Sequence, residues 1–140
     1  MKTNNSIKEN KPLFTAALIL LIYGIAEMGD CIYAFLITLH IVPAPGFLLT
    51  FAFPAMQKIW THQPMFMLFI FLVFTSLRIS SALGILRNRL WGWWLALISS
   101  ILTLGVMPLF LPFGALDGII AVPLLILLLV GYFGHKAIIE

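Results

Sequence analysis

Four long apolar stretches occupy nearly the whole chain, and the breaks between them contain proline, glycine or arginine. The stretches predict helices over residues 13–41, 64–86, 90–111 and 115–134. A helix needs about 20 mostly apolar residues to cross a hydrocarbon core of about 30 Å, so each stretch is long enough to do so. We therefore expect an all-α fold, a bundle of four transmembrane helices that forms one integral membrane domain over residues 1–140.

The connection between the first two stretches, residues 43–63, is unusually apolar for a loop. It contains Pro54 and a single lysine, so we do not expect it to cross the membrane. Its pattern favours a segment that lies in the membrane interface, partly as a short amphipathic helix over residues 54–62. Aromatic and polar residues suited to headgroup depth are Trp60 and His62 in this connection and Trp91, Trp93 and Trp94 at the start of the third stretch.

The composition excludes a soluble domain, because 62% of the residues are hydrophobic and only 9% are charged. The basic residues flank the apolar stretches instead of forming a patch. The N-terminal tail, the second connection and the C-terminal tail carry Lys2, Lys8, Lys11, Arg87, Arg89 and Lys136, whereas the first and third connections carry only Lys58. The positive-inside rule then places both termini in the cytoplasm. We interpret the basic charge as a topology signal that also contacts anionic lipids, and we expect no nucleic-acid partner.

Three charged residues lie inside the apolar stretches: Glu27 and Asp30 in the first and Arg78 in the second. A charge at mid-bilayer costs about 2.5–3.5 kcal/mol on insertion scales, so these three need a compensating environment. We expect Arg78 to bridge to Glu27 or Asp30. Residues at helical spacing or at matching depth would complete a buried ligand or proton site made of Tyr23, Glu27, Asp30, Arg78, Ser81, Ser99 and Thr103.

Three interpretations of this cluster stay open. It could be an ion pair that only fixes helix register. It could be a site for a ligand, a proton or an ion, which is the usual role of ionisable residues inside a membrane. Alternatively, one carboxylate faces the first connection and is solvated. With two acids and one base, one carboxylate is in excess, and it should be protonated or bound to something.

The histidines and the single cysteine predict no metal and no cofactor. His135 is expected on the opposite side of the membrane from His40 and His62, which excludes a site made of all three histidines. His40 and His62 could share an outer site with Asp117, although single interfacial histidines are usually solvated. Cys31 is the only cysteine, so no intramolecular disulfide can form, and we interpret it as a small packing residue.

Two stretches resemble known membrane proteins. The sequence LGILRNRLWGWWLALISSILTL, residues 83–104, resembles the junction of helices 2 and 3 in small uncharacterised prokaryotic four-helix membrane proteins, which implies that fold and no activity. The sequence GIAEMGD resembles the first helix of small multidrug-resistance transporters, which carries an essential glutamate after alanine. That resemblance implies Glu27 as a proton-exchanging carboxylate, whereas Asp30 and Arg78 are charges that the family lacks.

Three functions are compatible with the sequence. The leading hypothesis is a non-enzymatic membrane protein that binds a protein partner or a lipid-like ligand through the polar cluster and the apolar outer connection. The alternative is a small proton-coupled transporter that uses Glu27 or Asp30. The third is an intramembrane lipid-modifying enzyme that uses these acids with His40. Gly114 and Gly118 allow close helix packing, within one chain or between copies in a homo-oligomer.

Overall fold

The computed structural model describes residues 7–43, 54–106, 108 and 114–134, without the side chains of residues 54–56 and 60. The predicted all-helical fold is confirmed over these ranges, in which no strand occurs. The elements are a short 3₁₀ helix η1 (Ile7–Glu9) and the α-helices α1 (Lys11–Thr38), α3 (Pro54–His62), α4 (Pro64–Leu86), α5 (Leu90–Val106) and α6 (Gly114–Phe133). Residues 107 and 109–111, where the third predicted helix would continue, lie outside the described residues.

Three helices, α1, α4 and α6, are long and apolar enough to cross a membrane. The fourth, α5, is apolar but has 17 residues, which corresponds to about 25 Å of helix. Large apolar side chains on these helices point away from the bundle, with Ile22, Phe69 and Ile119 among the most exposed. An outward-facing apolar surface of this kind is typical of helices in contact with lipid chains.

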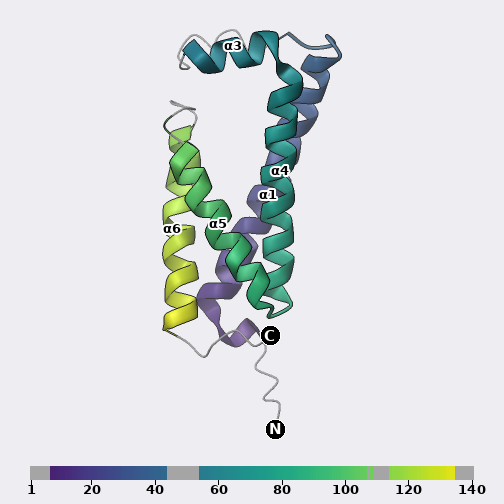
Figure 1. Ribbon diagram of the computed structural model, residues 1–140. Coiled ribbons are helices and arrows are strands. Elements are labelled where there is room, and N and C mark those ends of the chain that lie inside the picture. The colour runs from purple at the N-terminus through teal and green to yellow at the C-terminus, as the bar shows by residue number, and fades with distance from the viewer. Residues whose placement is uncertain (1–6, 44–53, 107, 109–113, 135–140) are drawn as a thin grey trace.

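The four long helices pack in a ring, in which α1 contacts α4, α4 contacts α5, α5 contacts α6 and α6 contacts α1. The start of α1, the α4–α5 turn and the end of α6 lie at one end of the bundle, and α3 lies at the other (Figure 1). At the first end, the side-chain amide of Asn10 donates a hydrogen bond to the carbonyl of Gly131, at 2.9 Å. Toward α3, the pair α1 and α4 spreads away from the pair α5 and α6 (Figure 1).

Both α1 and α4 are followed, two residues after their last helical residue, by a residue with a left-handed backbone: His40 and Asn88, each with a φ of 57°. The amide of Ile41 donates to the carbonyl of Leu36, and the amide of Arg89 donates to the carbonyl of Gly84. These bonds back to an earlier carbonyl form the Schellman motif, which satisfies the last carbonyls of a helix. The first helix therefore ends at Thr38, before the predicted residue 41.

The apolar core fills the bundle at the end opposite α3. Its members are mostly alanines and leucines, together with one tryptophan: Leu13, Ala16, Ala17, Leu20, Ala82, Ile85, Trp93, Ala96, Leu124 and Leu128. Small side chains let the helices approach closely, above all where α4 meets α5 at Gly84 and Gly92. A β-carbon built on Gly84 would lie 2.5 Å from the α-carbon of Gly92.

The predicted interfacial tryptophans divide into two groups. Trp91 and Trp94 are exposed on the surface of α5. Trp93 differs from the expectation, because it is only 3% exposed and belongs to the core. Its indole nitrogen donates to the carbonyl of Leu128 at 3.0 Å, and its ring stacks on Tyr132. A buried indole needs such a partner, and a carbonyl of α6 supplies it.

Trp60 and His62, the residues of the first connection that were predicted to lie in the membrane interface, belong to α3. His62 is exposed, and its ring nitrogen Nδ1 lies 2.8 Å from the hydroxyl of Thr61. Trp60 belongs to the same helix, but its side chain lies outside the described atoms. The predicted short helix over residues 54–62 is present as α3.

Candidate functional site

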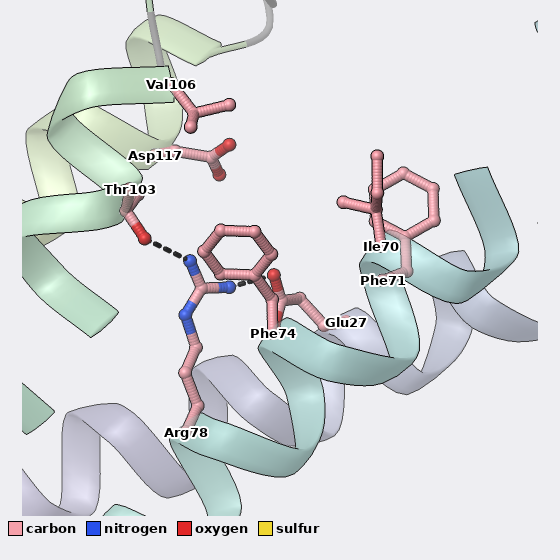
Figure 2. A pocket seen from close by; sticks show the side chains of 8 residues that line it. All are labelled: Glu27, Ile70, Phe71, Phe74, Arg78, Thr103, Val106 and Asp117. Atoms are coloured by element: carbon pink, nitrogen blue, oxygen red, sulfur yellow. Dashed lines mark hydrogen bonds and ion pairs between the residues drawn. The ribbon is translucent and has the colours of Figure 1, made fainter. Parts of the chain in front are cut away.

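A buried ion pair joins α1 to α4 inside the bundle. The guanidinium of Arg78 contacts the carboxylate of Glu27 through Nη1, and its Nη2 donates a hydrogen bond to the hydroxyl of Thr103 on α5, at 2.8 Å (Figure 2). Arg78 is 4% exposed and Glu27 is 8% exposed. Of the two acids predicted as partners of Arg78, Glu27 is the one that forms the pair. Three helices thus converge on one guanidinium.

Helix geometry explains how residues at different depths meet. Glu27 lies sixteen residues after the start of α1, or about 24 Å along the helix, and Thr103 lies thirteen residues after the start of α5, or about 20 Å. Arg78 lies eight residues before the end of α4, or about 12 Å from that end of its own helix. The helix ends are not level, because a β-carbon built on Gly24 would lie 3.5 Å from the β-carbon of Arg78. Glu27 follows Gly24 by three residues, or about 4.5 Å along α1, and the long side chain of Arg78 covers this difference.

Two threonine hydroxyl groups contact the ion pair: that of Thr75 contacts Glu27, and that of Thr103 contacts Arg78. Thr75, one helical turn from Arg78, donates to the other oxygen of Glu27 at 3.5 Å, and the thiol of Cys31 lies 3.6 Å from the same hydroxyl. The hydroxyl of Thr103 donates to the carbonyl of Ser99 at 2.9 Å, which leaves its oxygen lone pairs free to accept the bond from Arg78.

Ser81 and Ser99 are buried, but they are not part of the pair. Ser81 donates to the carbonyl of Arg78 at 2.8 Å, and Ser99 donates to the carbonyl of Ala96 at 3.0 Å. Each serine therefore bonds to its own helix, as buried serines in apolar helices commonly do. Neither lines the cavity beside Arg78. This differs from the expectation that both belong to the site.

Asp117 of α6 enters the cluster, although the sequence did not assign it there. The hydroxyl of Tyr23 donates to the carboxylate of Asp117, and the ring of Tyr23 lies 3.9 Å from the centre of the Arg78 guanidinium. Tyr23 therefore connects Asp117 to the ion pair. The available signal was depth: Asp117 lies sixteen residues before the end of α6, which matches the distance of Glu27 from the start of α1.

Asp30 lies outside the cluster, which corrects the expectation for this residue. It is exposed and does not line the cavity. Three residues along a helix correspond to a rotation of about 300°, so Asp30 is displaced by about 60° from the face that carries Glu27. Asp30 still lies close enough to Asp117 for the two carboxylates to repel each other.

His40 is exposed beyond the end of α1, where it borders a separate surface depression with Pro43 and Thr61. It is therefore not part of the cluster. Across the described ranges, no group of three histidine, cysteine, aspartate or glutamate side chains is placed to hold a metal ion.

A small, partly open cavity lies beside the ion pair (Figure 2). The residues that line it come from all four long helices and combine charged and hydroxyl groups with aromatic and aliphatic ones: Glu27 of α1, Ile70, Phe71, Phe74 and Arg78 of α4, Thr103 and Val106 of α5, and Asp117 of α6. The space open to the centres of water-sized spheres is about 60 Å³. One water needs about 10–15 Å³ on this measure, so the cavity has room for several waters or for one small chemical group.

Comparison with known protein families, characterised proteins and solved structures finds no match for this chain. The fold and the site together define a helical protein with three helices of membrane-crossing length and a buried ion pair beside a cavity.

Proposed function

We propose that this protein is a four-span integral membrane protein that binds an amphipathic, lipid-like ligand beside the Glu27–Arg78 pair. The observation that supports the proposal is the cavity itself, whose lining combines charged groups with aromatic and aliphatic side chains. Ligand sites in proteins commonly combine apolar walls with a few polar groups that fix orientation. A lipid-like molecule would place a polar group against the charges and its apolar part along α4 and the bilayer.

The ring packing of the bundle supports the inclusion of α5 as a fourth span. Its 17 residues lie at the lower limit for a spanning helix, and it packs between two helices of full length. Arg87 and Arg89 lie in the turn at the end where α1 begins and α6 finishes, so the positive-inside rule places this end in the cytoplasm. In this proposal α3 lies at the outer surface.

The proposed topology predicts opposite labelling of two single-cysteine variants in intact cells. In a Cys31→Ala background, Thr61→Cys on α3 should react with a membrane-impermeant maleimide, because Thr61 is exposed at the outer end. Glu9→Cys at the opposite end should react only after the membrane is permeabilised. Labelling of Glu9→Cys in intact cells, with Thr61→Cys protected, would reverse the proposed orientation.

The arrangement of the acids favours binding over the proton-coupled carrier. That hypothesis relies on Glu27 or Asp30 to exchange a proton. Glu27 is held by Arg78 and Thr75, and Asp30 lies outside the cavity. The lipid-modifying enzyme needs His40 near these acids, whereas His40 lies beyond the end of α1, thirteen residues or about 20 Å along the chain from Glu27.

Filling the cavity should remove the ligand. Val106 lines the cavity, so Val106→Phe adds a ring where the ligand would lie. Native mass spectrometry of the full chain in a non-ionic detergent should show a retained small molecule on the wild type and at least tenfold lower occupancy on the variant. Ile98→Phe is the matched control on the same helix, because Ile98 is exposed to the lipid side.

The control should retain the ligand at the level of the wild type. A wild-type chain that carries neither lipid nor any other small molecule would contradict the proposal, and so would equal occupancy in Val106→Phe. Size-exclusion elution and helical circular dichroism identify any variant that fails to fold.

A further inference from the structure

The guanidinium of Arg78 is already engaged by groups of the protein. Nη1 contacts the carboxylate of Glu27, Nη2 donates to Thr103, and the ring of Tyr23 covers one face at 3.9 Å. With 4% of its surface exposed, Arg78 has little capacity left to receive an anionic ligand. The positive charge of Arg78 is therefore neutralised by the carboxylate of Glu27.

Asp117 leaves the cavity with one negative charge in excess. The described lining holds two carboxylates, from Glu27 and Asp117, and a single cation, Arg78. The hydroxyl that Tyr23 donates to Asp117 is neutral, so it stabilises the carboxylate without cancelling its charge. Asp117 also lies in the first turn of α6, where the helix dipole favours a negative group.

The surroundings of this charge suit an organic cation better than a metal ion. The lining also contains Ile70, Phe71, Phe74 and Val106, and aromatic rings attract ammonium groups through their faces. A bare metal ion would find no set of three carboxylate, histidine or cysteine ligands among the described residues.

In this cavity the carboxylate of Asp117 lies among aromatic side chains, and the charge of Arg78 is already balanced by Glu27. We infer that the ligand carries an ammonium group on an apolar body. This inference rests on the proposed binding function and adds the chemical class of the ligand. The ammonium group occupies the small cavity, against the carboxylate of Asp117 and the ring of Phe74. The apolar body extends from the open side of the cavity toward the lipid.

The test compares two probes of equal chain length and opposite charge. Full-length protein in a non-ionic detergent is mixed with dodecyltrimethylammonium and dodecyl phosphate, and native mass spectrometry measures the occupancy of each. The wild type should retain the ammonium probe at least tenfold better than the phosphate probe. Asp117→Asn should abolish this preference, because asparagine keeps an oxygen that accepts the Tyr23 bond but removes the charge. Glu9→Gln is the control, since it removes one exposed carboxylate at the other end of the bundle.

The outcomes separate the two proposals. Preference for dodecyl phosphate, or equal binding of both probes, would overturn the inference about charge while leaving the binding function intact. Unchanged preference in Asp117→Asn, or equal loss in Glu9→Gln, would overturn the role of Asp117. Binding of neither probe, together with no retained molecule on the purified wild type, would overturn the binding function itself.

Discussion

Replacing Glu27 by leucine is expected to lower the free energy of unfolding by about 3–5 kcal/mol, the usual result of breaking a buried ion pair by removing one partner. The variant leaves the guanidinium of Arg78 buried without the carboxylate that it contacts. Thr103 would remain as a neutral partner and cannot replace a charge. Thermal unfolding in a non-ionic detergent, followed by helical circular dichroism, measures the change.

Two further variants show whether the effect belongs to the pair. Glu27→Leu combined with Arg78→Leu should recover most of the lost stability, because a buried ion pair replaced by apolar residues is often neutral. Asp30→Leu removes an acid from the same helix but disturbs no pair, so it should unfold close to the wild type. A double variant as unstable as Glu27→Leu alone would show that the pair is not the source of the loss.

The double variant also distinguishes a structural role of the pair from a functional one. If the pair only fixes helix register, the recovered protein should still retain its ligand. If the pair forms the polar side of a binding cavity, the recovered protein should fold and lose the ligand. Occupancy by native mass spectrometry, measured beside the unfolding temperature, separates these two results.

Most of the helices were predictable because apolar runs of membrane length leave few alternatives. The second helix has the predicted bounds, and the fourth differs by one residue at each end. The end of α1 was not predictable. The left-handed residue that follows α1 is His40. This position is usually glycine or asparagine, and the corresponding residue after α4 is Asn88.

The site was predictable only in part. Glu27 and Arg78 stand out because charges inside an apolar stretch need partners. Asp30 has the same signal, and only the packing of α1 against α4 decides which acid faces the bundle. Asp117 was considered only for an outer site with His40 and His62, because it lies near the start of its helix, although its depth counted from the end of α6 matches that of Glu27 counted from the start of α1. The burial of Trp93 was not predictable for a similar reason, because the sequence of three nearby tryptophans does not reveal which ring points into the bundle.

The second large effect is expected where α4 and α5 cross at Gly84. A β-carbon at this position would lie 2.5 Å from the α-carbon of Gly92 and 3.0 Å from the ring of Trp91. The first contact involves backbone, which cannot rotate away, so the two helices must separate. Gly84→Ala should therefore destabilise the protein by about 1–3 kcal/mol, the usual range for overpacking.

Gly29→Ala provides a control of opposite expected sign. Gly29 also lies inside a helix, but nothing lies within 4 Å of a β-carbon built there. Alanine is favoured over glycine in a helix interior by about 0.5–1 kcal/mol, so this variant should unfold at the same temperature as the wild type or above it. Because the two substitutions add the same methyl group, the difference between their unfolding temperatures isolates the close approach of α4 and α5. A Gly84→Ala variant as stable as Gly29→Ala would show that these helices are not in contact at Gly92.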